Sequence, residues 1–191
     1  PAGEIQAPGV IRHVEGERFA IGELDGSQTE RVGRVADALT RAGFKAFVLD
    51  NIRAEIWLKL WGNMSFNPIS ALTHATLVDL CQFTPTRELA AAMMREAQSI
   101  AGKLGIEFRV PLEKRIAGAE NVGNHKTSTL QDIEAGREIE TEALLGAVLE
   151  LARLTQTPAP ACEAVYALLS LLAKTMVEQK AAIRLTKLGS E

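Results

Sequence analysis

The character of the sequence changes near residue 50, and this change constrains the fold more than any other feature. Upstream of Asp50, short apolar segments alternate with turn-forming residues, which is typical of strands. Downstream, apolar residues recur every three or four positions almost without interruption, which is the period of amphipathic helices. The sequence therefore predicts a mixed region over residues 1–50 and a helical region over residues 51–191.

The first region is predicted to contain strands with one helix among them. Strand-like segments cover residues 10–14, 19–22 and 45–49, and residues 15–18 suit a hairpin loop between the first two. A capping signal at residues 27–30 precedes a helical pattern that Gly43 closes. The order strand–strand–helix–strand is typical of the closing portion of an α/β domain.

The second region is predicted to be an all-α bundle of roughly six helices. Asp50 or Asn51 can cap the first helix, and Pro68 is expected to kink or break it because proline supplies no amide. Thr84 and Pro85 favour the start of a long helix ending near Gly105. Further helices are expected from Pro111, over residues 128–154 and over residues 162–183, the last being apolar enough for the centre of the bundle or a subunit contact.

Composition argues against several classes of partner. The net charge is −3 and no basic patch is present, so we expect neither a nucleic-acid nor a membrane-surface partner. The longest apolar run, residues 164–173, is about half of the ~20 residues that cross a bilayer. Cys81 and Cys162 have no Cys or His companions at metal-ligand spacing. We interpret them as free thiols in a reducing cytoplasm, with a disulfide as the alternative.

The beginning of the chain has no initiator Met and no charged and apolar regions of a signal peptide. We therefore expect a fragment of a longer protein.

Lys59, Asn63 and Asn67 are spaced four residues apart, and successive steps of four advance by about 40° around a helix. The three side chains should therefore form one stripe, on a helix whose flanking residues are mostly apolar. Buried polar groups need partners, and a polar substrate would supply them. A solvated helix face, or polar pairs between helices, would produce the same pattern.

A second polar segment begins at Ser128, which with Gln131 favours a capping box at a helix N-terminus. The free amides of such a terminus make it a natural carboxylate site, although Ser128 could equally serve only as a cap. Glu140 lies three turns further along this helix and, by itself, is compatible with a surface charge.

The two segments together resemble the ketopantoate reductase family. The first pattern is Lys with Asn at +4 and Asn-Pro at +8, preceded by Ile-Trp; the second is Ser with Gln-Asp ending at +4 and Glu eight residues past the Asp. The residues that carry these patterns are Lys59, Asn63, Asn67-Pro68, Ser128, Gln131-Asp132 and Glu140. Both patterns match in order and spacing, and the resemblance runs from about Val10 to the last helix.

The resemblance implies a helical bundle of the 6-phosphogluconate dehydrogenase C-terminal type, preceded by the last strands and helix of an NADPH-binding Rossmann domain. It implies NADPH-dependent reduction of 2-dehydropantoate to pantoate in pantothenate and coenzyme A biosynthesis. Lys59 would be the general acid, and Asn63 and Asn67 would hold the substrate's hydroxyl and keto groups. Ser128 would bind its carboxylate, and Glu140 would contact the nicotinamide ribose and help to set Lys59.

Two departures from the family pattern are visible. A further substrate Asn of the family falls at Leu77, so another branched 2-oxo acid is an alternative substrate. No G-x-G-x-x-G is present, so we expect the fragment itself to be inactive and the activity to belong to the full-length protein. A non-catalytic helical interaction module is the alternative from another functional class. The apolar last helix is compatible with a homodimer.

Overall fold

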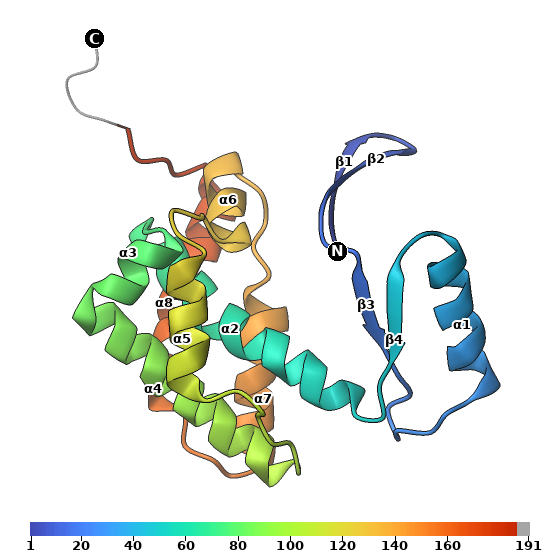
Figure 1. Cartoon of the computed structure of the whole chain (residues 1–191). Helices are drawn as coiled ribbons and strands as arrows, with labels where there is room; N and C mark the ends of the chain where they lie inside the picture. The colour runs from blue at the N-terminus through green and yellow to red at the C-terminus, as the bar shows by residue number, and fades with distance from the viewer. Residues whose placement is uncertain (187–191) are drawn as a thin grey trace. The chain divides into compact units, whose positions relative to one another are not determined.

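The computed structural model describes residues 1–186 and divides the chain into two compact units, Pro1–Ile56 and the residues from Trp57 onward (Figure 1). The elements in chain order are β1 (Ala2–Ala7), β2 (Val10–Glu15), β3 (Arg18–Ile21), α1 (Glu30–Arg41), β4 (Lys45–Val48), α2 (Ile52–Thr73), α3 (Leu77–Gln82), α4 (Thr84–Lys103), α5 (Leu112–Asn121), α6 (Ser128–Ala135), the π-helix η1 (Glu142–Gly146), α7 (Ala147–Leu154) and α8 (Pro160–Gln179). The predicted fold class, mainly helical with a short α/β region before it, is confirmed.

The first unit contains two separate two-stranded sheets. β1 and β2 form an antiparallel hairpin whose turn includes Gly9 at a φ of 78°. The sequence-based expectation of a hairpin between residues 10–14 and 19–22 was therefore wrong. The strand at residues 10–14 pairs backward with β1, because Pro8-Gly9 supplies the tight turn that residues 15–18 were expected to form.

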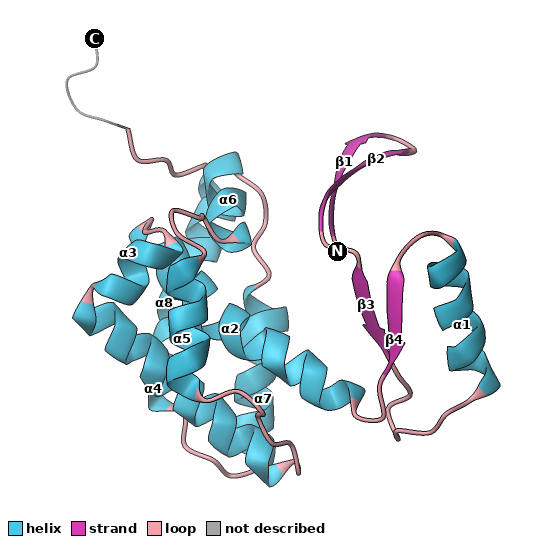
Figure 2. Ribbon diagram, viewed as in Figure 1, coloured by secondary structure: helices cyan, strands magenta, loops and turns pink. Residues whose placement is uncertain are grey.

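The second sheet pairs β3 with β4 in parallel, and α1 is the crossover between them (Figure 2). Thr29 caps α1 by accepting a hydrogen bond from the Val32 amide. The helix ends just before Gly43, whose φ of 91° suits glycine. The predicted strand–helix–strand arrangement after residue 18 is confirmed.

α2 begins at Ile52, and the side chain of Asn51 accepts from the Ala54 amide at 3.1 Å. Of the predicted kink or break at Pro68, the break is excluded, because the helix continues to Thr73. Residues 64–71 are buried without exception. Packing around this stretch offsets the cost of proline in a helix interior, which is about 3 kcal/mol.

α4 is the helix around which the second unit is assembled, and it packs against α3, α5, α7 and α8. Its inward face buries Met93, Met94 and Ile100 completely. The indole of Trp61 on α2 donates to the Met94 carbonyl at 2.7 Å, so the one polar atom of this buried ring has a partner. α3, a short helix that begins with a capping box between Thr76 and Asp79, was not predicted from the sequence.

The single helix expected over residues 128–154 was wrong. α6 ends at Gly136, which adopts a left-handed conformation at a φ of 68°, and residues 137–140 are irregular before η1 and α7. Glycine is the residue best suited to this helix-terminating conformation, so the chain leaves the helix there. Glu140 therefore lies on an irregular connection and not on the helix where it was predicted.

α8 starts where Glu96 of α4 accepts from the Ala161 and Cys162 amides, both at 2.9 Å. By length and composition alone, α8 could cross a bilayer, with a mean hydropathy of 1.3 over its most apolar window. Core helices of soluble proteins pass the same test. Cys81 and Cys162 are free and buried, as expected, and burial raises the pKa of both thiols.

Candidate active site

Exposure falls along the predicted stripe of α2. Lys59 is exposed, Asn63 is half-buried, and Asn67 is only 8% exposed. The gradient arises because α2 runs from the edge of the helical unit into its core. A flexible ammonium therefore lies at the open end of the stripe and two amides lie progressively deeper, an arrangement that suits a small polar ligand.

The structure brings the two predicted motifs together. The Asn67 side-chain amide donates to the Ser128 hydroxyl at 3.4 Å, although the residues are 61 positions apart. The predicted capping box of Ser128 was wrong, because Thr127 is the N-cap and its hydroxyl accepts from the Leu130 amide. Since Thr127 performs the capping, Ser128 occupies the first helical position with an exposed side chain that can face a ligand.

Leu77, the departure from the family pattern, lies beside the loop that leads to Ser128. Its amide donates to the His125 carbonyl at 3.0 Å, and the Val78 amide donates to the Gly123 carbonyl at 3.3 Å. These bonds tie the N-terminus of α3 to the 123–125 loop. Both bonds are made by backbone atoms, so they place residue 77 beside this loop whatever its side chain.

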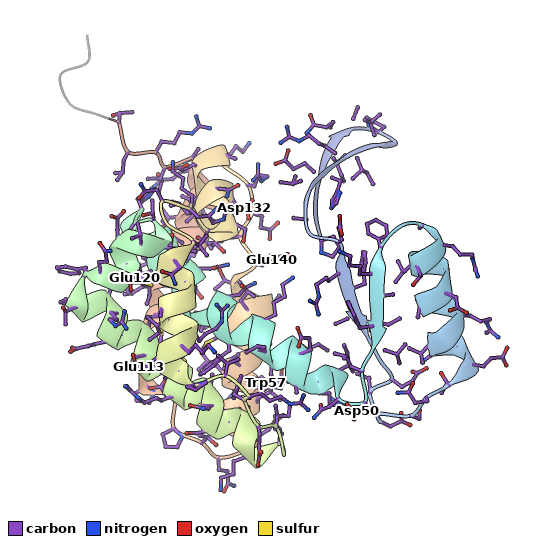
Figure 3. The ribbon with its side chains drawn as sticks, viewed as in Figure 1. Asp50, Trp57, Glu113, Glu120, Asp132 and Glu140 are labelled. Atoms are coloured by element: carbon purple, nitrogen blue, oxygen red, sulfur yellow. The ribbon has the colours of Figure 1, made fainter. Side chains whose placement is uncertain are left out.

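Glu140 is exposed on the irregular connection after α6 (Figure 3). It lines a cavity of about 1040 Å³ between this connection, η1 and the second half of α8. At the same wall, Tyr166 donates to the Glu142 carboxylate at 2.6 Å, and this bond raises the pKa of the phenol. Across residues 1–186 no ion pair joins Lys59 to Glu140, so their predicted partnership stays a prediction.

One charged group close to the stripe was not predicted from the sequence. The Arg115 guanidinium packs against α2 at Gly62, and its pKa is lowered because burial disfavours the charge. This contact joins a glycine in the middle of α2 to an arginine far away in the sequence, so no local sequence pattern predicts it. In the described part of the chain, no cluster of three His, Cys, Asp or Glu could hold a metal ion.

Comparison with known proteins assigns the family. The sequence profile described as "Ketopantoate reductase PanE/ApbA C terminal" matches residues 51–173, which is more than half of the chain. This chain belongs to the ketopantoate reductase family. It is 54% identical over 173 residues to a 2-dehydropantoate 2-reductase of Mesorhizobium japonicum, covering 91% of this chain and 53% of that relative. The chain thus spans about half the length of the curated ketopantoate reductases it matches.

Solved structures agree with the family assignment. The 2-dehydropantoate 2-reductase of Methylococcus capsulatus matches with a TM-score of 0.82 and 32% identity, over 92% of this chain and 61% of that one. Two more distant likenesses show the fold alone. A D-mandelate dehydrogenase with NADH and anilino(oxo)acetate has a TM-score of 0.78 at 21% identity, covering 92% and 59%. A dimeric ketopantoate reductase of Staphylococcus aureus has 0.75 at 19%, covering 92% and 60%.

Enzymes of the ketopantoate reductase family are NAD(P)H-dependent oxidoreductases. In this chain the exposed Glu140 carboxylate, at the edge of its cavity, fits as an acceptor for ribose hydroxyls. The sequence has no glycine-rich turn for a pyrophosphate. The residues present therefore fit a ribose of such a cofactor.

Proposed function

We propose that the whole protein reduces 2-dehydropantoate to pantoate with NADPH. The observation that carries the proposal is the contact between Asn67 and Ser128, because it joins the two family motifs in one place. The 54% identity to a relative named 2-dehydropantoate 2-reductase supports the same activity. The substrate would be a small 2-oxo acid, with no nucleic-acid or membrane partner.

Residues 1–50 would form the end of the nucleotide-binding domain, and residues 51–191 the substrate-binding domain. The β3–α1–β4 unit supports this division, because parallel strands joined by a helix are the repeating unit of such domains. Two strands alone make a marginal sheet, so further strands would pair with them in the whole protein. Free buried thiols fit a cytoplasmic enzyme.

The reaction needs a proton donor beside the keto oxygen. Bound NADPH would supply a hydride to the keto carbon, and the electron pair of the C=O π bond then moves onto oxygen. The Lys59 ammonium stabilises this developing negative charge and transfers its proton to form the hydroxyl. Lys59 is at the exposed end of the stripe, so it regains a proton from solvent after each turnover.

Binding and alignment would fall to the remaining residues of the two motifs. Asn63 and Asn67 each present a donor and an acceptor, which suits the hydroxyl and keto groups of the substrate. Ser128, at the start of α6, would bind the carboxylate, helped by the positive end of that short helix. Glu140 would hold the nicotinamide ribose and orient Lys59.

Lys59→Ala in the whole protein tests the role of the ammonium. We expect kcat to fall by about 10²–10⁴-fold with a much smaller change in KM, because the proton is needed only in the transition state. Lys103→Ala, which removes an exposed lysine at the end of α4, should leave both constants unchanged. Equal losses in kcat and affinity, or no loss, would contradict the assignment.

A second candidate is reduction of another branched or bulkier 2-oxo acid. Leu77 favours it, because an apolar residue stands where the family pattern has an Asn that could hydrogen-bond a substrate hydroxyl, and its backbone is bonded to the 123–125 loop. The D-mandelate dehydrogenase that shares the fold was solved with an aromatic oxo-acid ligand. Comparing kcat/KM for 2-dehydropantoate, 2-oxoisovalerate and benzoylformate in the whole protein separates the candidates. Turnover of none of them would instead favour a non-catalytic helical module.

The structure also supports self-association. Leu168 and Leu171 are 59% and 62% exposed on α8, one turn apart, and a relative with this fold is dimeric. The proposed partner is a second copy of the chain, with the two α8 faces in contact.

A further inference from the structure

The guanidinium of Arg115, on α5, packs directly against α2 at Gly62. A Cβ atom placed on Gly62 would lie 2.8 Å from the Arg115 Cζ and 3.2 Å from its Nε, and nearer still to a terminal nitrogen. Any residue other than glycine would therefore displace the guanidinium. The same guanidinium lies 6.0 Å from the centre of the Phe66 ring, one turn further along α2.

The Arg115 side chain is half-buried, and it forms no ion pair or hydrogen bond with the described side chains of residues 1–186. The two nearby acidic residues of its own helix form ion pairs with another arginine. Glu113 and Glu120, both on α5 (Figure 3), pair with Arg87 of α4 at 3.3 and 3.4 Å. A partly desolvated guanidinium presents donors in a fork that matches a carboxylate, so its natural partner is an anion.

The position of Arg115 on α2 is close to the proposed substrate-binding stripe of Lys59, Asn63 and Asn67. Gly62 and Phe66 come one position before Asn63 and Asn67, so their row lies about 100° around α2 from the stripe. Gly62 is also three residues after Lys59, which places the two on neighbouring parts of one helix face. An anion bound between Lys59 and Gly62 would therefore contact both cations.

We propose that Arg115 is a substrate-binding residue that recognises the carboxylate of the 2-oxo acid. Gly62, which has no side chain, leaves the space that the guanidinium needs on α2. The inference rests on the proposed function. A carboxylate offers about four lone-pair positions, so it can accept from Arg115 and from Ser128 together. Arg115 fixes the acid end of the substrate while Lys59 serves the keto oxygen.

The test compares a 2-oxo acid with its own carboxamide in the whole protein, using the better substrate from the assay above. In the unmodified enzyme we expect the acid to be strongly preferred. In Arg115→Gln, kcat/KM for the acid should fall by roughly 10–100-fold, mostly through KM, while the amide is unaffected, because a charge-assisted bond is lost only with the acid. Arg115→Lys should restore part of the preference.

Two further variants distinguish binding from a structural role. Gly62→Ala keeps the arginine but displaces it, and should weaken the acid preference; Gly118→Ala, at a helical glycine of α5 with open space around it, should not. Lys114→Gln, which removes an exposed charge beside Arg115, should change neither substrate.

Equal effects of Arg115→Gln on acid and amide, or none on either, overturn the inference and leave the proposed function intact. If no 2-oxo acid is reduced by the unmodified protein, the proposed function itself fails. If Arg115→Gln does not fold, Gly62→Ala and Arg115→Lys decide: an unchanged acid preference in both overturns the inference.

Discussion

Asn67 and Leu77 are ten residues apart, and each is bonded either to Ser128 or to the loop that precedes it. Asn67 reaches the Ser128 hydroxyl directly, and the Leu77 backbone is bonded to the loop before it. One position is polar and the other apolar in the same neighbourhood. At the scale of single residues, this contrast would govern which 2-oxo acid fits the proposed site, since a site that hydrogen-bonds a hydroxyl discriminates strongly against ligands that lack one.

Leu77→Asn should therefore raise the preference for 2-dehydropantoate over 2-oxoisovalerate, which lacks the hydroxyl. We expect the ratio of kcat/KM values to rise by roughly tenfold, equivalent to about 1.4 kcal/mol for one neutral hydrogen bond. Steady-state kinetics of the whole protein on both acids measures the ratio. Leu104→Asn, at an exposed leucine after α4, is the matched control. An unchanged or lowered ratio would mean that residue 77 does not contact the substrate.

At the scale of elements, the start of α8 depends on a carboxylate from another helix. Glu96 accepts from two amides that no side chain of α8 satisfies, because α8 lacks a capping residue of its own. Unsatisfied amides at a helix N-terminus are costly, and a negative charge there is favourable. Glu96 thus connects α4 to α8 as well as closing the helix end.

Glu96→Gln should lower the free energy of unfolding by about 1–2 kcal/mol, because one acceptor and the charge are lost. Glu96→Ala should cost more than the glutamine variant. Urea denaturation followed by far-ultraviolet circular dichroism measures both, with Glu88→Gln on the exposed side of α4 as the control. A Glu96→Gln protein as stable as the Glu88→Gln control would show that solvent satisfies these amides equally well.

At the scale of the whole molecule, the exposed leucines of α8 bear on assembly. Replacing both Leu168 and Leu171 by Glu places two charges in the proposed subunit contact and should convert a dimer into a monomer. Sedimentation velocity gives the mass directly. Leu154→Glu, at a leucine 73% exposed outside α8, should leave the dimer intact. A monomeric unmodified protein, or a double variant that stays dimeric, would exclude this contact.

The buried thiols report on the integrity of the helical unit. Cys81 and Cys162 are 1% and 0% exposed, and desolvation raises the pKa of each thiol, so little thiolate exists near neutral pH. Neither should react with iodoacetamide at pH 8 in the native protein, and both should react fully in urea. Mass spectrometry of the two peptides reads the labelling. Rapid native labelling of either would show that its surroundings open readily.

The sequence alone determined the helical class, the boundary in character near residue 50 and the residues of both motifs, because periodicity, caps and motif spacing are local properties. It failed where local preference competes with packing or with an unrecognised turn. Pro68 stays inside α2, Gly136 ends α6 early, and the hairpin forms one strand before the expected place. Each of these outcomes depends on neighbours that a local window does not contain.

Only the tertiary structure decided which distant residues meet. In the structure Asn67 contacts Ser128, and Thr127 rather than Ser128 caps α6. Arg115 packs against Gly62. Contacts between residues tens of positions apart follow from how helices pack, and helix packing is set by the shapes of whole faces acting together. No stretch of sequence read by itself contains that information.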